Sequence, residues 1–287
     1  MEKITLKNAS KSNDIEDFNY KKIYDNCHID LSEVMMLPPT ALGIGHHEYK
    51  GNTYLNNTFS YGEFSTIKAK SKTKKTFFKS ALIAGYIGGN ITNYFCEFKT
   101  QRDQEWHVID IDTEQGDYYA QRAFRRVAEL VGDAYVHYYP FGLEALNPAQ
   151  IIQFIDELFK DPKHKGKIKW LSIDGIADLV ENINDIKESV AVASKLKMWR
   201  KDNNCHINCV IHKIRDGKSI GHLGSYIEKK SETVIDLEDT DPDPKNMNSP
   251  IEVVHSFSRG APFTPFHFKL DNDTLPKECN VNTDQWT

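Results

Sequence analysis

The sequence predicts an α/β protein with a mostly parallel, twisted sheet, helices on both faces and antiparallel strands at the C-terminal edge. Strand-like and helix-like stretches alternate from residue 64 to residue 212, as they do where crossover helices join parallel strands. The strand-like stretches after residue 231 then follow one another without helices. Acidic or ionisable residues end several of these strands, at the position where such sheets bind ligands.

Periodicity and boundary residues place the individual elements. Asn147 and Pro148 form an N-cap with proline at the first helical position, and Gly88 follows the expected end of an earlier helix. A polar loop is expected over residues 213–224 and an acidic one over residues 238–250. We expect strands at residues 64–68, 106–112, 135–139, 168–174, 206–212, 231–237, 251–257 and 263–270, and helices at residues 75–87, 117–131, 148–159 and 186–201.

The domain organisation follows from composition along the chain. Residues 1–38 are polar with a few apolar anchors, and they predict an N-terminal arm that is partly disordered or packs on a partner. Residues 39–272 form the expected α/β domain, and residues 273–287 a polar tail. Within the domain, a hairpin is expected over residues 41–57 with its turn near Gly51 and Asn52.

Overall composition narrows the possible classes. The net charge of −5 does not predict general coating of nucleic acid, although a local basic patch is compatible with it. Five cysteines, an odd number, do not indicate a secreted disulfide framework. We find neither a signal peptide nor an apolar run of about 18 residues. We therefore expect a cytoplasmic protein with no membrane partner.

A lysine-rich stretch, which we call the lysine loop (residues 69–76), joins the first core strand to a helix. This strand–loop–helix context is typical of a phosphate-binding P-loop, in which Lys75 would contact the β- and γ-phosphates and Thr76 would hold Mg²⁺. Helix amides would also face the anion. The usual glycines, which provide positive φ, are replaced by Ala69 and Lys74. The alternative is an exposed basic loop that binds no ligand or touches nucleic acid.

Two carboxylates end neighbouring strands. Asp174 follows an apolar strand, as in a Walker B motif, where the carboxylate holds Mg²⁺ through water. A helix N-cap is the alternative for this residue. Glu114, just beyond the previous strand, is placed to polarise a water molecule toward a γ-phosphate. Its alternative is a first-turn carboxylate stabilised by the helix dipole.

His212 ends a further apolar strand and could sense a phosphate, or it could be an ordinary core histidine. Cys205 and Cys209 share a face of this strand but lie too far apart to chelate one ion, so zinc is not expected. Arg259 lies in a turn between two strands, where it is either a surface residue or an arginine finger for a neighbouring subunit. The basic segment 213–225 is fit to touch the phosphates of a strand or is an ordinary solvated loop.

The order of these motifs resembles the RecA-like P-loop ATPases, and most of all the RepA-type plasmid helicases and the related hexameric replicative helicases. The resemblance covers roughly residues 40–272. It rests on the lysine loop, Asp112-Thr-Glu-Gln115, Asp174-Gly175, His212-Lys213, the Gly-x-x-Gly-Ser run ending at Ser225, and Ser258-Arg-Gly-Ala-Pro-Phe263. The sequence departs from the family pattern at the P-loop, where Ala69 and Lys74 replace the glycines.

The resemblance implies a RecA-like fold that binds ATP and Mg²⁺ between the subunits of a homo-oligomeric ring, a hexamer, and acts on single-stranded DNA. By position, Glu114 would be the catalytic base, His212 the sensor and Arg259 the finger acting in trans. Thr76 and Asp174 would hold Mg²⁺. Lys213, Arg215, Lys218 and His222 would face DNA. The nucleotide would contact Ala69, Lys70, Ser71, Lys72, Thr73, Lys74, Lys75, Thr76 and Phe77.

Two other functions remain open at this stage. One is a non-hydrolysing module of the same fold that uses the lysine loop to hold nucleic acid or a partner. The other is a kinase-like phosphotransferase, although no substrate lid or acceptor site is evident in the sequence.

Overall fold

The computed structural model describes residues 19–132, 136–213, 219–241, 246 and 248–280. The chain divides into two compact units, Met1–Leu37 and Pro38–Thr287. In the first unit, helix α1 (Tyr20–Cys27) is capped by the Asn19 side chain, which accepts a hydrogen bond from the Lys22 amide at 3.0 Å, and none of its residues is buried. Residues 1–18 of the predicted arm and residues 281–287 of the predicted tail lie outside the described residues.

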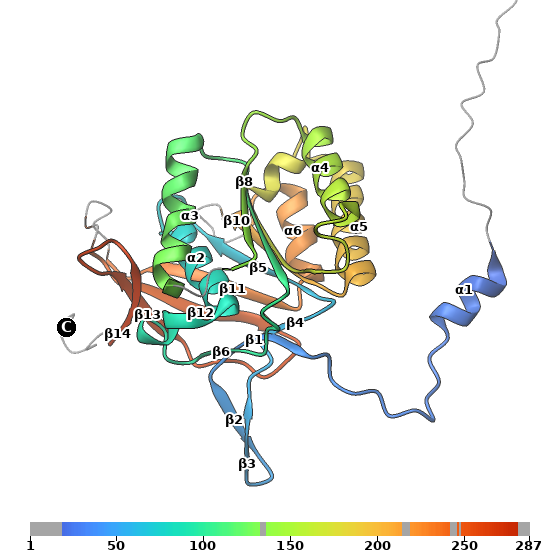
Figure 1. Ribbon diagram of the computed structural model, residues 1–287, viewed down its shortest axis with the longest axis horizontal. Helices are drawn as coiled ribbons and strands as arrows, with labels where there is room; N and C mark the ends of the chain where they lie inside the picture. The colour runs from blue at the N-terminus through green and yellow to red at the C-terminus, as the bar shows by residue number, and fades with distance from the viewer. Residues whose placement is uncertain (1–18, 133–135, 214–218, 242–245, 247, 281–287) are drawn as a thin grey trace, which may run out of the picture. The chain divides into compact units, whose positions relative to one another are not determined.

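The second unit is built on a nine-stranded mixed sheet with the order β14-β13-β12-β11-β5-β10-β9-β7-β8 (Figure 1). Strands β11, β5, β10, β9, β7 and β8 run parallel, and β12, β13 and β14 continue the sheet antiparallel. The predicted parallel core with an antiparallel C-terminal edge is therefore confirmed. The strands are β5 (Phe64–Ala69), β7 (His107–Asp112), β8 (Tyr138–Gly142), β9 (Ile168–Asp174), β10 (His206–His212), β11 (Thr233–Asp239), β12 (Ile251–Ser258), β13 (Phe266–Leu270) and β14 (Pro276–Cys279).

Helices cover both faces of this sheet, as predicted. Figure 1 shows α2 and α3 on one side of the parallel strands and α4, α5 and α6 on the other. Each side has its own hydrophobic core, the first including Phe78 and Val127 and the second including Ile155 and Leu196. The helices are α2 (Lys75–Ile87), α3 (Asp117–Val131), α4 (Pro148–Lys160), α5 (Ile186–Asn203) and α6 (Gly221–Lys230), with short 3₁₀ helices at Gly89–Asn93 and Ile176–Leu179.

Two small sheets accompany the main one, and they correct the predicted hairpin over residues 41–57. Strand β1 (Thr40–Ile44) pairs antiparallel with β4 (Phe59–Ser60) and with β6 (Phe98–Thr100). The hairpin itself is formed by β2 (His46–Tyr49) and β3 (Asn52–Leu55), and it projects from the unit in Figure 1. Gly51 adopts a φ of +77° in its turn, as expected near this position.

Helix α6 is a second correction, because its first turn lies where the sequence predicted a polar loop. Gly221 and Gly224 argue against a helix locally, yet Leu223 and Ile227 are buried on one face of it. A Cβ on Gly224 would lie 2.9 Å from the Ser219 Cβ and 3.3 Å from the Ile211 Cγ2. Glycine therefore allows the helix to pack closely on its neighbours, and tertiary packing outweighs the local propensity.

Three further differences concern strands. Strand β8 begins three residues later than predicted, because His137 adopts a left-handed φ of +59° that interrupts the extended run. The short strands β6 and β14 were not predicted, and β14 lies within the segment assigned to the polar tail. Within the described ranges, no helix combines the length and the hydropathy that crossing a membrane requires.

Candidate functional site

The lysine loop leaves the carboxyl end of β5 and enters α2 with two residues in the left-handed conformation. Lys72 has a φ of +67°, and Lys74, the N-cap residue of α2, has φ +52° and ψ +29°. A residue with a Cβ pays about 1–2 kcal/mol for this conformation, which glycine adopts freely. Of the two positions where a P-loop has glycine, Lys74 therefore keeps a left-handed backbone, whereas Ala69 is the last residue of β5 and does not. Such local strain points to a functional constraint.

The side chains of this loop divide into exposed and anchored ones. Lys70, Ser71 and Lys72 are exposed, whereas Thr73 and Lys75 are buried. Lys74 Nζ donates to the Ser249 carbonyl oxygen and hydroxyl, both at 3.1 Å, and burial lowers the pKa of Lys74.

Lys75 begins a chain of polar contacts that joins three of the predicted catalytic residues. Its Nζ lies 2.8 Å from His212 Nδ1, so that donation by the ammonium places the ring proton on Nε2. That Nε2 lies 3.4 Å from Glu114 Oε1. The contact with His212 lowers the pKa of the Glu114 carboxyl, and burial lowers the pKa of Lys75 against the opposing charges of Asp174 and Glu114.

Lys79, one helical turn after Lys75, is a residue that sequence reasoning missed. It is fully buried, and its Nζ lies 3.1 Å from Asp110 Oδ1 and 3.2 Å from Asp174 Oδ2. Burial alone would lower the pKa of this ammonium, but Asp110, Asp174 and Asp112 together raise it. Lys79 therefore fixes Asp174 at the end of β9 and holds three carboxylates near one cation.

The turn that carries Glu114 is fixed by its neighbours. Asp112 Oδ1 accepts hydrogen bonds from the amides of Glu114 at 3.0 Å and Gln115 at 2.8 Å. Thr113 Oγ1 donates to Asp178 Oδ2 at 2.7 Å. Gly175 has a φ of +92°, and a Cβ there would lie 2.1 Å from the Thr113 hydroxyl, so this position admits only glycine. The carboxyl ends of β7 and β9 are thereby locked together.

These strand ends open into a cavity of about 530 Å³. Residues 72–77 of the lysine loop and the helix start line it, together with Glu114, Asp174 and His212. Helix α3 contributes Tyr119, Arg122 and Arg126 to the lining. The cavity is also lined by Asp239, Asn246 and Leu270. The predicted convergence of β5, β7, β9 and β10 on one rim is therefore what the structure has.

In the sequence, Arg122, Arg125 and Arg126 form a basic stripe along α3, which does not by itself show which of them reaches a site. Arg126 lies with its guanidinium carbon 3.7 Å from the centre of the Phe77 ring and with Nη1 3.3 Å from the Ser80 hydroxyl. Burial and the neighbouring charge of Arg122 together lower the pKa of Arg126 to about 10. The pocket thus contains two arginines besides its lysines, and the direction of the stripe could not be read from periodicity alone.

The structure does not bring the remaining predicted residues to this pocket. Lys213 is buried, with its Nζ hydrogen-bonded to Asp236 and 3.5 Å from Glu238, so its ammonium does not face a DNA strand. His222 is exposed in the first turn of α6 rather than in a loop. Arg215 and Lys218 lie outside the described residues.

Arg259 follows β12, whose last residue, Ser258, pairs with Thr233 at the start of β11. Because β11 runs parallel to β5, this position is at the amino ends of the parallel strands, opposite the lysine loop. Arg259 Nη1 lies 3.9 Å from Glu63 Oε2, and the side chain is 52% exposed. It cannot reach the pocket of its own chain from there.

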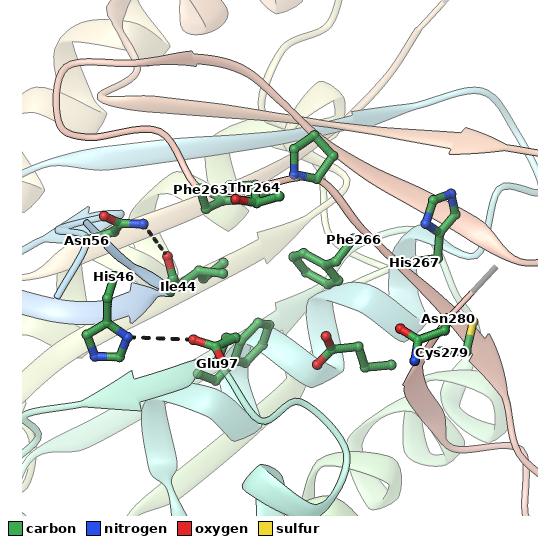
Figure 2. A pocket seen from close by; sticks show the side chains of 14 residues that line it. Ile44, His46, Asn56, Glu97, Phe263, Thr264, Phe266, His267, Cys279 and Asn280 are labelled. Carbon is green, nitrogen blue, oxygen red and sulfur yellow. Dashed lines mark hydrogen bonds and ion pairs between the residues drawn. The ribbon is translucent and has the colours of Figure 1, made fainter. Parts of the chain in front are cut away.

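A second cavity, of about 550 Å³, lies among β1, β6, β13 and β14 (Figure 2). His46 and Glu97 form an ion pair of 3.6 Å at its edge, and Phe263 and Phe266 are among its apolar lining residues. Figure 2 also shows the hydrogen bond of 2.9 Å from the Asn56 amide to the Ile44 carbonyl. None of the described residues that line this cavity follows the carboxyl end of a parallel strand, so the first pocket is the better candidate for phosphate chemistry.

Thr76 and Asp174, the two expected Mg²⁺ ligands, both line the first pocket. Their hydroxyl and carboxylate oxygens are hard donors that suit this ion, and Asp174 Oδ2 is a buried oxygen whose nearby cation is Lys79. In the parts of the chain that the structure describes, no group of three or more His, Cys, Asp or Glu side chains is arranged to hold a metal by itself.

No protein-family model matches this sequence, and no curated protein matches it.

Proposed function

We propose that this protein binds ATP and Mg²⁺ in the pocket of the lysine loop and that it is a RecA-like motor acting on single-stranded DNA. Such a motor would act as a helicase in the replication or mobilisation of an extrachromosomal element. The observation that carries the proposal is the contact chain Lys75–His212–Glu114 beside Asp174, at the mouth of the lysine loop.

Each residue has a definite role in this proposal. Lys75 holds the terminal phosphates, and Thr76 and Asp174 hold the ion that neutralises them. Glu114, ionised because its pKa is lowered, orients a water molecule for attack. His212 bridges Lys75 and Glu114, so movement of Lys75 onto a phosphate changes the hydrogen bonding of His212 and passes the change to β10. Tyr119 of α3 and Leu270 also line the pocket and would contact the base.

The ring belongs to the proposal as well. Arg259 lies at the opposite rim from the pocket, so a role as arginine finger requires a second copy that presents this rim to the first copy's pocket. Light scattering with and without ATP tests the assembly. A monomer under both conditions would contradict the finger role.

Nucleotide binding and hydrolysis can be tested separately. A fluorescent ATP analogue should bind the wild type in the presence of Mg²⁺, and Lys75→Ala should weaken binding about 10- to 100-fold, the value of a charge-assisted contact. Lys187→Ala, an exposed lysine of α5, is the matched control and should leave affinity unchanged. Asp174→Asn should reduce the Mg²⁺ dependence of binding.

Glu114→Gln should retain the analogue but lower ATP turnover about 10²- to 10⁴-fold, and single-stranded DNA should stimulate the wild type. Absence of nucleotide binding by the wild type would defeat the proposal. Turnover that is unchanged in Lys75→Ala and Asp174→Asn would defeat the enzymatic part.

A non-hydrolysing module is the second candidate, and one observation favours it. Lys74 is anchored on Ser249 and Lys72 carries the strain of a positive φ, so the loop is less free to wrap a triphosphate than a glycine loop. This candidate predicts DNA binding that is insensitive to ATP, falls steeply with salt and is lost when the loop lysines are replaced.

A further inference from the structure

A second group of lysines lies between α4 and β9, in a segment that we call the basic turn (residues 160–169). It holds five lysines and one acidic residue, Asp161, in a chain whose net charge is −5. Lys160 pairs with Glu157 at 2.8 Å, and Lys169 Nζ donates to the Asn203 carbonyl at 2.7 Å. The other three lysines, Lys163, Lys165 and Lys167, are exposed, and among the described residues none of them has an ion-pair partner.

The backbone of the basic turn is well fixed. Asp161 Oδ1 accepts a hydrogen bond from the Lys163 amide at 2.7 Å, and the Asp161 carbonyl accepts from the Lys165 amide at 2.8 Å. The Lys167 amide donates to the His164 carbonyl at 2.9 Å. The Asp161 carboxylate is hydrogen-bonded to the backbone of the turn. The ammonium groups of Lys163, Lys165 and Lys167 therefore project from a backbone of fixed conformation.

Two buried histidines, His107 of β7 and His164 of the basic turn, lie against each other. His107 Nδ1 and His164 Nδ1 lie 3.0 Å apart. Burial, the neighbouring histidines, Lys167 and Lys163 together lower the pKa of His107 to about 4. Burial and Lys163 likewise lower the pKa of His164, against the opposing charge of Asp161. The histidine pair therefore adds no negative charge that would offset the three exposed ammonium groups.

An aromatic ring accompanies these charges. Lys163 Nζ lies 4.2 Å from the centre of the Tyr139 ring, and Tyr139 belongs to β8, the edge strand of the main sheet. Tyr139 also packs against His107 and His164, with ring centres 4.9 and 4.7 Å apart, so its ring supports Lys163. The basic track that surfaces for single-stranded nucleic acid offer to the phosphate backbone is therefore made here by the lysines.

We propose that Lys163, Lys165 and Lys167 bind the phosphate backbone of single-stranded nucleic acid. The choice of single strands rests on the proposed function. We assign nucleic-acid binding to this surface and not to the predicted segment 213–225, because Lys213 in that segment is hydrogen-bonded to Asp236. It lies at the amino ends of the strands, since the Lys167 carbonyl accepts from the amide of His107 at the start of β7, and thus at the opposite rim from the nucleotide pocket.

The test compares two variants that each remove three exposed positive charges. Lys163→Gln/Lys165→Gln/Lys167→Gln removes the proposed contacts, and Lys187→Gln/Lys197→Gln/Lys229→Gln changes α5 and α6 instead. Binding of a labelled oligothymidylate is measured by anisotropy in a salt series. Three lost phosphate contacts should reduce the slope of log K against log salt by about 2 and weaken binding about 10- to 100-fold at 0.1 M salt. The control should change affinity less than about 3-fold.

Several results would overturn this inference: no oligothymidylate binding by the wild type, equal binding by the first variant, or equal losses in both variants. Binding of poly-glutamate that oligothymidylate does not displace, and that the first variant loses, would assign the surface to an acidic protein instead. An oligouridylate arm distinguishes RNA from DNA. The first variant should bind the ATP analogue like the wild type, so failure of nucleotide binding in the wild type would contradict the proposed function alone.

Discussion

The two rims of the main sheet use charge in opposite ways. At the carboxyl rim, Lys75 and Lys79 are buried and contact His212, Asp110 and Asp174. At the amino rim, Lys163, Lys165 and Lys167 of the basic turn are exposed and have no ion-pair partner among the described residues. Buried, paired charges fix the geometry of a reactive site, whereas exposed, unpaired charges can bind a polyanion.

The amino rim also buries an acid, Glu232, that forms no ion pair with any residue the structure describes. Glu232 accepts hydrogen bonds from the Ser60 amide at 2.9 Å and from the Ser60 hydroxyl. Burial raises the pKa of Glu232 to about 7, against the opposing effect of these hydrogen bonds. Lys79 and Glu232 thus represent two solutions to the burial of charge: a salt bridge at the carboxyl rim and protonation at the amino rim.

The largest expected effect concerns Lys79. Lys79→Met leaves Asp110 and Asp174 buried without their cation, and we expect a loss of about 3–5 kcal/mol in the free energy of unfolding. Urea denaturation measures it. Lys75→Met, one turn earlier in the same helix, is the matched control and should cost about 1–2 kcal/mol, because its partner is a partly exposed histidine. Equal losses in both variants would contradict the role given to the buried cluster.

The next effect is a pH dependence that belongs to Glu232. Between about pH 4.5, the ordinary pKa of this carboxyl, and about pH 7, the folded state keeps a proton that the unfolded state has released. Stability from this group is therefore fully present below pH 4.5 and is lost as the pH rises toward 7, by roughly 3 kcal/mol in total.

Glu232→Gln should remove this slope. Denaturation of both proteins from pH 4.5 to 7.5 measures the difference between them, so the opposite contribution of His107, which is lost as the pH falls toward 4, cancels. Parallel curves for wild type and variant would refute the raised pKa.

A smaller effect distinguishes two lysines of the same loop. Lys72→Gly relieves a positive φ and should stabilise the protein by about 0.5–1 kcal/mol after the entropy cost of glycine. Lys70, also exposed, does not have a positive φ, so Lys70→Gly should destabilise by a similar amount. Thermal unfolding measures both. Equal signs for the two substitutions would argue against strain at Lys72.

The smallest effect on stability is expected at Arg259. Its contact with Glu63 is long and half-exposed, so Arg259→Gln should cost less than about 1 kcal/mol. A finger acting in trans should nevertheless make the variant lose about 10³-fold in turnover. Mixing Arg259→Gln with Lys75→Ala subunits should restore activity, because some interfaces then combine an intact Lys75 with an intact Arg259. No recovery on mixing would speak against the role in trans.

Many of the helices and strands could be predicted, because the sequence patterns that specify them are local. The apolar run of β9 and the Asn147–Pro148 start of α4 specify these elements without reference to the rest of the chain. Helix α6 could not be predicted, since its glycines favour a loop and only close packing on Ser219 and Ile211 reverses that preference. Strand β14 has few residues and depends on pairing with β13, which no local pattern reports.

For the candidate site, the sequence by itself determined which chemical groups end the strands: the lysine loop, Glu114, Asp174 and His212. Parallel strands bring their ends to one rim whatever their side chains are. Only the tertiary structure decided that Lys79 holds Asp174 and that Arg122 and Arg126 face the pocket. It also decided that Lys213 pairs with Asp236, whereas Lys163, Lys165 and Lys167 of the basic turn have no ion-pair partner among the described residues. The physical reason is that periodicity reports burial along one segment, whereas the pairing of charges depends on distances between segments far apart in the chain.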